Sequence, residues 1–427
     1  MRIVHSIKKK IFHLYSYIEL WIEICQTRKL QKTALKRIKG KSPLTCVFLA
    51  LESSVWKYDR IYQIMTKNSR IKPIILVCPV VDYGKEQMIR KMNLCYTRFF
   101  NEGYNVIKSY NEESNSFFDV RDLKPDIILY TNPYKGLIDD RYYITNFKDI
   151  LTVYVSYCIN CSKDDSFSCD LNLHNLVWRK YAETEYAMNV SKRVQKRHGE
   201  NVVYTGYPGI ELLIDKDYIP IRNPWKLDNV NHKRIIWAPH HTIQRCEYGY
   251  TCFLKYCDFM LEMARKYEDR VQFVFKPHPI LRSKLELLWG RKKTDLYYES
   301  WTNMSNTTID ENEYIDLFLT SDAMIHDSGS FTVEYLYVNK PVMRTVSDMP
   351  LNDLFNQFGL DCIKQYYLGY SESDIEHFIQ DVINDVDPMK EQRTKFVNEV
   401  LMPKGSPSQN IIDDILDSID NQILYRN

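Results

Sequence analysis

The sequence lacks a long uninterrupted apolar run. Hydrophobic residues make up 44% of its 427 residues and charged residues 26%, which is ordinary for a globular protein. Near the N-terminus, Glu19 and Glu23 interrupt the stretch closest to the roughly 20 apolar residues that a membrane span needs. No small-residue cleavage site follows that stretch. We therefore expect neither a transmembrane helix nor a secretory signal peptide.

The cysteines form no regular framework. There are 11 of them, an odd number at irregular spacing, which favours reduced thiols in a cytosolic protein over disulfides. Cys158, Cys161, Cys169 and His174 carry zinc-ligand chemistry. Their spacing is loose, however, so free or buried thiols are the favoured interpretation, and we expect no metal.

Basic residues are not spread along the chain. Met1–Gly40 carries ten Lys and Arg against two Glu, a net charge of +8, while the whole protein has a formal charge of +2. The other residues therefore sum to −6. A nucleic-acid-binding protein would carry basic charge along its main surface, so we exclude nucleic acid as a partner.

The basic N-terminal segment, residues 1–40, is predicted to be an amphipathic helix. Its apolar residues recur at steps of three or four, as one helix face requires. These residues are Ile3, Ile7, Ile11, Leu14, Ile18, Trp21 and Cys25. Two interpretations stay open: the helix lies on an anionic membrane surface, or it docks on the protein's own first domain.

Strand-like and helix-like segments alternate after Pro43, which predicts an α/β fold with parallel sheets. The expected strands of the first half are 45–51, 72–78, 125–131, 151–157 and 201–206. Those of the second half are 234–239, 271–277, 295–300, 322–326 and 340–346. The pattern predicts two Rossmann-like domains facing across a cleft. Their bounds are 41–214 and 234–404, with a linker at 215–233 and a C-terminal helix in 405–427.

Two polar motifs follow expected strands of the second domain, where parallel sheets bind ligands. In 237-WAPHHTI-243 the strand stops at a proline and presents His240 and His241. In 273-FVFKPHPILR-282, prolines on both sides hold His278 in an extended conformation, and Lys276 and Arg282 lie close by. Such cationic groups suit a phosphate.

A third motif, 326-HDSGS-330, separates an apolar strand from a predicted helix. It supplies Asp327 as a donor-binding residue, two candidate N-cap residues in Ser328 and Ser330, and Gly329 for close backbone approach. A diphosphate at this helix N-terminus would receive several N–H bonds. Glu334, on the same helix face as Ser330, would accept hydrogen bonds from ribose hydroxyls. Each motif alone is more often structural, and only the convergence of all three in one domain indicates a binding site.

Together these motifs resemble one enzyme family, the CDP-glycerol glycerophosphotransferases of teichoic-acid polymerisation. The resemblance spans about residues 201–344 and includes 206-GYPGIELL-213, 235-IIWAPHHT-242, 276-KPHP-279 and 313-EYIDLFLTSDAMIHDSGSFTVEYLYVNKPVM-343. It implies a GT-B fold with the nucleotide in the C-terminal domain and the acceptor in the N-terminal domain. It also implies transfer of glycerol or ribitol phosphate from a CDP-activated donor to a polymer or glycolipid acceptor, releasing CMP.

By this resemblance, His278 would contact the pyrophosphate or transfer a proton, Ser328 and Ser330 would hold phosphate oxygens, and Glu334 would hold the ribose. No further cofactor is expected. The protein would work in the cytoplasm, on the inner membrane face, with residues 1–40 on anionic lipid.

The chain departs from the family where members carry a Trp-His-Gly-Thr-Pro motif, because 151-LTVYVSYCINC-161 holds no histidine. The base would then be His240, His241 or His174. Two alternatives stay open: a GT-B glycosyltransferase with a nucleotide-sugar donor, and a non-catalytic nucleotide-binding scaffold.

Overall fold

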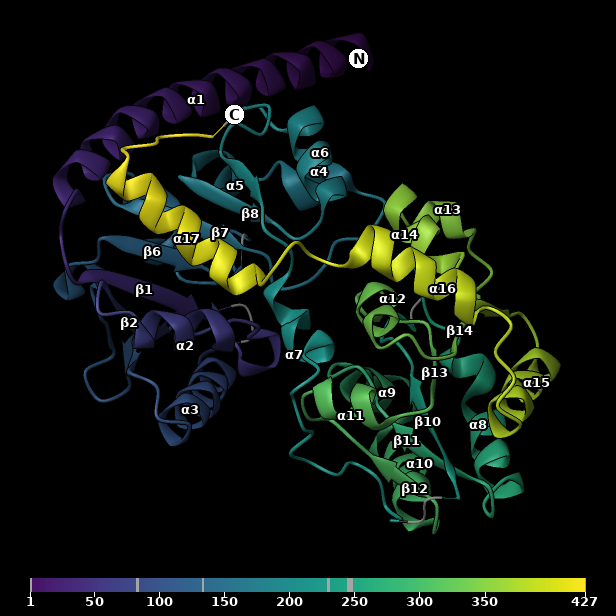
Figure 1. Ribbon diagram of the computed structural model, residues 1–427. Helices are drawn as coiled ribbons and strands as arrows, with labels where there is room; N and C mark the ends of the chain where they lie inside the picture. The colour runs from purple at the N-terminus through teal and green to yellow at the C-terminus, as the bar shows by residue number, and fades with distance from the viewer. Residues whose placement is uncertain (1, 82–83, 133, 229–230, 244–248, 427) are drawn as a thin grey trace. The chain divides into compact units, whose positions relative to one another are not determined.

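The computed structural model describes residues 2–81, 84–132, 134–228, 231–243 and 249–426, with side chains from residue 17 onward except at residue 54 (Figure 1). The chain forms two compact units. The first comprises Met1–Cys158, Asp165–Gly209 and Pro403–Asn427, and the second comprises Ile159–Asp164 and Ile210–Met402. The predicted α/β class with two parallel sheets is confirmed.

The first unit contains a seven-stranded parallel sheet in the order β3-β2-β1-β6-β7-β8-β9. Its strands are β1 (Leu44–Ala50), β2 (Ile71–Val77), β3 (Val106–Lys108), β6 (Ile127–Tyr130), β7 (Leu151–Val155), β8 (Arg179–Ala182) and β9 (Val202–Tyr204). The central strands are rich in Val, Ile and Leu and buried on both faces, because helices and loops cover both sides of the sheet. A small hairpin pairs β4 (Tyr110–Asn111) with β5 (Ser116–Phe117).

Two hydrophobic cores cover the two faces of this sheet. The helices of the unit are α1 (Arg2–Ile38), α2 (Asp59–Lys67), α3 (Lys85–Asn101), α4 (Asp165–Cys169), α5 (Asn172–Leu176), α6 (Glu185–Val194) and α17 (Pro407–Asp420). The helices α2, α3 and α17 supply one core, which Figure 1 shows with α17 beside α2. The segment after β6, together with α5, supplies the other. The C-terminal helix therefore completes the core of the first unit.

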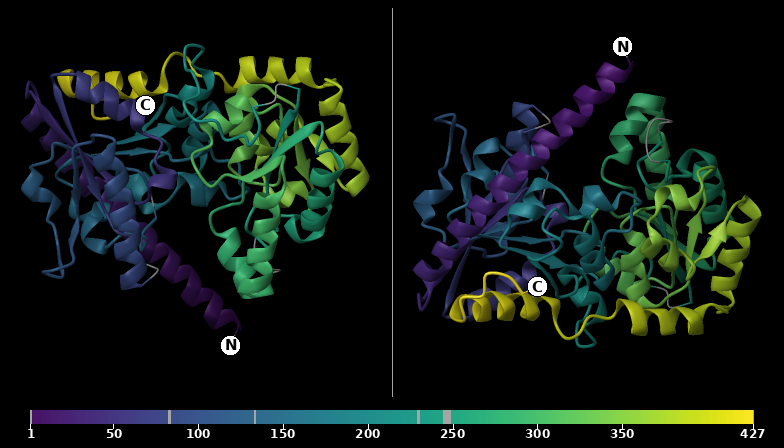
Figure 2. Two further views of the ribbon diagram at one scale, coloured as in Figure 1. Left: turned by 90° about the horizontal axis from the view of Figure 1, so that it is seen from below. Right: turned by 90° about the horizontal axis from the view of Figure 1, so that it is seen from above.

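The long helix α1 packs on its own unit through a face that differs from the predicted one. Leu20, Ile24, Ala34, Leu35 and Ile38 are buried. Ile18 and Trp21, which belong to the predicted face, are 47% and 40% exposed, and Cys25 is half-buried. The side chains of Ile3, Ile7, Ile11 and Leu14 lie outside the described residues. The N-terminal part of α1 projects beyond its sheet (Figure 2).

The second unit contains a six-stranded parallel sheet in the order β12-β11-β10-β13-β14-β15. Its strands are β10 (Lys233–Ala238), β11 (Val271–Phe275), β12 (Thr307–Ile309), β13 (Ala323–His326), β14 (Val342–Thr345) and β15 (Tyr367–Gly369). The strands β11, β10 and β13 are neighbours at its centre, so the residues that follow them lie along one edge.

The helices of the second unit are α7 (Glu211–Ile214), α8 (Phe253–Lys266), α9 (Leu281–Trp289), α10 (Arg291–Asn303), α11 (Ile315–Thr320), α12 (Phe331–Glu334), α13 (Leu351–Leu354), α14 (Gln357–Ile363), α15 (Glu372–Ile383) and α16 (Lys390–Phe396). The prediction of a strand at 295–300 is wrong, because this segment lies within α10. Tyr297, Tyr298 and Trp301 follow helical spacing and are buried against the sheet. Tyrosines are frequent in strands, which suggested a strand here, but the spacing of the buried aromatic residues is that of a helix.

The predicted linker is anchored to the second unit where the structure describes it. The Tyr218 hydroxyl donates to Asp316 at 2.8 Å, and the Arg222 guanidinium donates to Asp310 at 2.8 Å. The indole N–H of Trp225 donates to Thr320 at 2.8 Å. Among the described helices, none is both long enough and apolar enough to cross a membrane.

Candidate active site

The predicted motifs of the second unit meet at the carboxyl edge of its sheet. Residues 276–278 follow β11, residues 239–241 follow β10, and residues 327–330 follow β13, and these three strands are adjacent and parallel. Two hydrogen bonds tie the three turns together. The His278 N–H donates to the Pro239 carbonyl at 3.3 Å, and the His240 N–H donates to the Asp327 carboxylate at 2.6 Å.

Three imidazoles form a cluster at this edge. The ring centroids of His240 and His241 are 4.3 Å apart, those of His241 and His278 are 4.2 Å apart, and those of His240 and His278 are 5.0 Å apart. The Lys284 ammonium lies 3.0 Å from Nδ1 of His241. The rings of His240 and His278 are each fixed by a contact two residues further along, to the Thr242 hydroxyl and the Ile280 N–H, both at 3.2 Å.

Burial keeps the imidazoles of His240 and His278 neutral. It lowers the pKa of His240 to about 2, with further lowering from His241, His278, Arg344 and Lys284. It lowers the pKa of His278 to about 3, helped by His241 and Lys284. A neutral imidazole has one lone pair, which His278 uses at Nδ1 to accept the Ile280 N–H. A bound anion would favour the protonated form of these rings. The cluster combines proton acceptors with a nearby fixed cation, Lys284.

Asp327 is turned toward the protein rather than toward a ligand. Its carboxylate accepts hydrogen bonds from the N–H groups of His240 and Cys252 and from the hydroxyls of Thr251 and Thr345. Burial raises its pKa despite these donors. Asp327 therefore positions the turn that carries His240. Because its carboxylate already accepts from four protein groups, this geometry does not favour the predicted direct contact with the donor.

Arg344, which the sequence did not point to, holds the turn that follows β13. Its guanidinium is fully buried and donates to the carbonyls of Asp327 and Ser328 at 3.1 and 3.0 Å. The signal for it was weak, because an arginine inside a strand after Lys340-Pro341 marks no motif by itself. Lys284 was missed as well, although a basic residue in the helix that follows KPHP was visible in the sequence.

The turn after β13 presents less of a helix N-terminus than expected. The helix α12 has only four residues and continues as a 3-10 turn. Ser330 occupies the predicted N-cap position of α12, but its side chain makes no capping hydrogen bond. The Ser328 N–H is taken by Nδ1 of His326 at 3.1 Å. A Cβ placed at Gly329 would meet no atom within 4 Å, so the space beside this backbone is open, and its predicted contact with a phosphate stays a prediction.

Three other predicted donor contacts have protein partners or are buried. The Lys276 ammonium donates to the carbonyls of Asp310 and Asn312 at 3.4 and 2.6 Å. Arg282 donates to Asp295 at 2.6 Å on α10. Glu334 is 2% exposed. Lys276 and Glu334 are buried, so a donor would reach them only after a rearrangement, whereas Arg282 is partly exposed. The predicted roles of all three stay predictions.

The three histidines of the cluster are also possible metal ligands. Within the described part of the chain, His240, His241 and His278 are the group of three such residues whose ligand atoms all lie within 4.8 Å of one another. Cys158, Cys161 and Cys169 form no such group with His174. His174 is fully buried in the first unit, where burial holds its pKa well below the ordinary value. Because His174 has no exposed surface, an acceptor hydroxyl could not reach it, and it is unsuited as the base.

A comparison of the sequence with models of protein families identifies the family of this chain. The family model described as CDP-Glycerol:Poly(glycerophosphate) glycerophosphotransferase matches residues 170–417. The chain belongs to this family. It is a glycerophosphotransferase-like transferase, as the resemblance predicted.

Solved structures share the fold of this glycerophosphotransferase. The wall teichoic acid polymerase TagF is 15% identical with a TM-score of 0.57, covering 98% of this chain and 99% of that chain. Its H444N variant soaked with CDPG is 13% identical with a TM-score of 0.56, with the same two coverages. S. aureus MnaA with UDP is 14% identical with a TM-score of 0.57, covering 90% and 99%. The predicted GT-B-like fold is thereby confirmed. No curated protein matches the sequence.

Proposed function

We propose that the glycerophosphotransferase uses the His240–His241–His278 cluster to transfer glycerol phosphate from CDP-glycerol to a hydroxyl of a polymer or glycolipid acceptor. The convergence of these imidazoles beside Lys284 and the open Gly329 turn is the observation that supports it. Phosphoryl transfer needs charge neutralisation and alignment. Lys284, the imidazoles and the hydroxyls of Ser328 and Ser330 supply both.

The reaction balances with these groups. The acceptor hydroxyl oxygen bonds to the phosphorus that carries glycerol, and the bond from that phosphorus to the bridging oxygen breaks. The bridging oxygen leaves as part of CMP, and the acceptor proton passes to a neutral imidazole of the cluster. His278, His240 and His241 are the candidates for this proton transfer. Because the protein supplies the positive charge, we propose that no metal or other cofactor takes part.

CMP release tests this assignment. We expect release from CDP-glycerol, and a drop of about 10²- to 10⁴-fold in its rate for His278→Ala. His377→Ala is the matched control, because His377 is exposed on α15 and far in sequence from the three motifs. An undiminished rate in His278→Ala would contradict the proposal. CDP-ribitol and UDP-sugars run in parallel, and turnover of a UDP-sugar alone would support the glycosyltransferase alternative.

We also propose that α1 holds the enzyme on the inner, anionic face of the cell membrane. Tyr17, Ile18, Trp21 and Ile22 are 40–52% exposed and lie within one and a half turns of the helix. Exposed Lys29 and Lys32 follow them along the helix. Apolar side chains and nearby basic charge are what an interfacial helix needs.

A further inference from the structure

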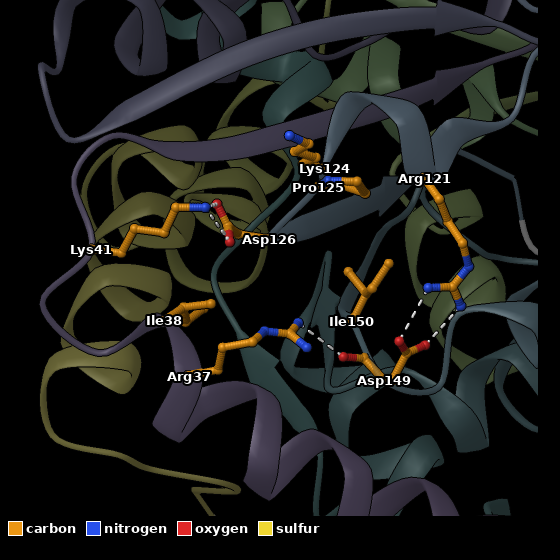
Figure 3. Close-up of a pocket in the computed structure, with 9 residues that line it drawn as sticks. All are labelled: Arg37, Ile38, Lys41, Arg121, Lys124, Pro125, Asp126, Asp149 and Ile150. Atoms are coloured by element: carbon orange, nitrogen blue, oxygen red, sulfur yellow. Dashed lines mark hydrogen bonds and ion pairs between the residues drawn. The ribbon is translucent and has the colours of Figure 1, made fainter.

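A basic pocket opens at the amino edge of the sheet in the first unit. It is lined by residues that precede three adjacent strands: Arg37, Ile38 and Lys41 before β1, Arg121, Lys124, Pro125 and Asp126 before β6, and Asp149 and Ile150 before β7 (Figure 3). Its volume is about 290 Å³. Parallel sheets bind their usual ligands at the carboxyl edge, so this pocket is separate from the sites where such sheets normally perform chemistry.

The two carboxylates in the pocket are already neutralised. Asp126 accepts two bonds from the Lys41 ammonium, at 2.8 and 2.7 Å, and a third from the Thr45 N–H at 2.9 Å. Asp149 accepts a two-pronged pair from Arg121 at 3.1 and 2.8 Å, and this guanidinium lowers the pKa of the carboxyl. Lys41 and Arg121 each neutralise one of these carboxylates. The pocket therefore keeps a net charge of +2, which Arg37 and Lys124 carry.

These two cations have spare donors. Arg37 donates one hydrogen bond, to the Asp149 carbonyl at 3.1 Å. The Lys124 ammonium makes no hydrogen bond or ion pair with any residue that the structure describes, and its backbone is left-handed, with φ of 49°. Figure 3 shows the two side chains on opposite sides of the opening.

The pocket combines this charge with an apolar floor. Ile38 and Ile150 are buried beneath the charged side chains, and Pro125 adds a further apolar wall. We propose that the pocket binds a glycerophosphate group, with the phosphate between Arg37 and Lys124 and the three-carbon chain on the isoleucines. Guanidinium and ammonium groups are the usual partners of phosphate oxygens. The volume suits a ligand of this size, since it is at the lower end for small-molecule sites, about 300 Å³.

This inference rests on the proposed function in one respect, because a glycerophosphate polymer supplies many such groups. A remote unit of the polymer, bound here, would keep a growing chain attached to the enzyme. The headgroup of phosphatidylglycerol offers the same chemistry from a lipid. Both sources present a phosphate ester next to a glycerol chain, and this glycerophosphate group is the proposed ligand.

Direct binding of sn-glycerol 3-phosphate tests the pocket. Calorimetry is carried out on full-length His278→Ala, so that failure of the transfer reaction does not affect the result. We expect saturable binding that weakens about tenfold in Lys124→Ala and in Arg37→Ala, as loss of one charged contact predicts, and that Lys124→Arg restores. Lys36→Ala is the matched control, since it removes an equal charge from the same helix outside the pocket.

The source of the group is then resolved by competition. A soluble glycerol phosphate oligomer that displaces the monomer, with the same dependence on Lys124, supports polymer as the ligand. Sedimentation with phosphatidylglycerol vesicles that depends on Lys124 and Arg37 supports the lipid headgroup. Equal affinity in Lys124→Ala, Arg37→Ala and Lys36→Ala, or no binding heat at all, would overturn the pocket assignment while leaving CMP release from CDP-glycerol intact.

Discussion

His326 is a buried histidine that supports the candidate site from within the second unit. It lies at the end of β13 with no exposed surface. Its Nδ1 accepts from the Ser328 N–H at 3.1 Å, and its Nε2 lies 3.3 Å from the Tyr366 hydroxyl. Burial, and secondarily the charge of Arg344, hold its pKa well below the ordinary value. The folded protein therefore keeps this ring neutral.

The neutral state of His326 predicts how stability depends on pH. As pH falls below about 6.5, the unfolded chain takes up a proton that the folded chain excludes. The free energy of unfolding should then fall by about 1.4 kcal/mol per pH unit for each such histidine. In His326→Gln this fall should be smaller by that amount, as measured by urea denaturation at pH 7 and pH 5.5. The exposed His377→Gln should keep the wild-type slope, and an unchanged slope in His326→Gln would contradict the argument.

At the residue scale, the sequence indicated where polar groups gather but not what each one contacts. The positions of His240, His241 and His278 followed from prolines and strand ends, which are local features. The contacts of Lys276 and Asp327 depend on loops distant in sequence, since Asp327 accepts from Cys252 and Lys276 donates to Asn312. Residue type is visible in a sequence, whereas the direction of a long side chain depends on such distant partners.

The helix α1 shows the same limit at the scale of an element. Its middle is apolar on nearly every side: Tyr17, Ile18, Leu20, Trp21, Ile22 and Ile24 fall within eight residues. Two different stripes therefore satisfy helical spacing. The structure buries Ile24 and leaves Ile22 52% exposed. The strands rich in Val and Ile were predictable because burial on both faces leaves a continuous apolar run.

The two stripes of α1 predict opposite results for two matched variants. Ile24→Asp places a charge in the core and should lower the free energy of unfolding by about 3 kcal/mol or more, measured by urea denaturation. Ile22→Asp should change stability by less than about 0.5 kcal/mol. It should instead weaken sedimentation with anionic vesicles about tenfold, because it removes an apolar contact with the membrane surface.

Equal vesicle binding by wild type and Ile22→Asp would contradict the membrane role of α1. The position of the buried face would be contradicted by the reverse ranking, in which Ile22→Asp destabilises the protein and Ile24→Asp does not. Vesicles of neutral lipid serve as the control for basic charge, since electrostatic attraction to Lys29 and Lys32 disappears there.

At the scale of the whole molecule, the chain leaves the first unit and returns to it at the C-terminus. Alternating strand and helix patterns predicted two sheets, because each βαβ unit is local in sequence. The same reasoning predicted a C-terminal helix but not its position. Arg179 donates to Asp414 at 3.0 Å and to the carbonyl of Leu424 at 2.6 Å. Contacts more than 200 residues apart leave no periodic signal.

A buried ion pair between Arg179 of β8 and Asp414 of α17 links this C-terminal segment to the sheet of the first unit. Arg179 has no exposed side-chain surface, and Asp414 also accepts from the Tyr181 hydroxyl at 2.8 Å. Arg179→Met should lower the free energy of unfolding by about 2 kcal/mol, because it removes the buried donor of Asp414 and of the Ile423 and Leu424 carbonyls, although Arg426 still pairs with Asp414 at 2.6 Å. The matched variant Arg193→Met breaks an ion pair to Asp165 whose arginine is 64% exposed, and should cost under about 1 kcal/mol. Faster proteolysis within 403–427 should accompany only the first variant. Equal losses in urea denaturation would show that the C-terminal segment does not stabilise the first unit through this pair.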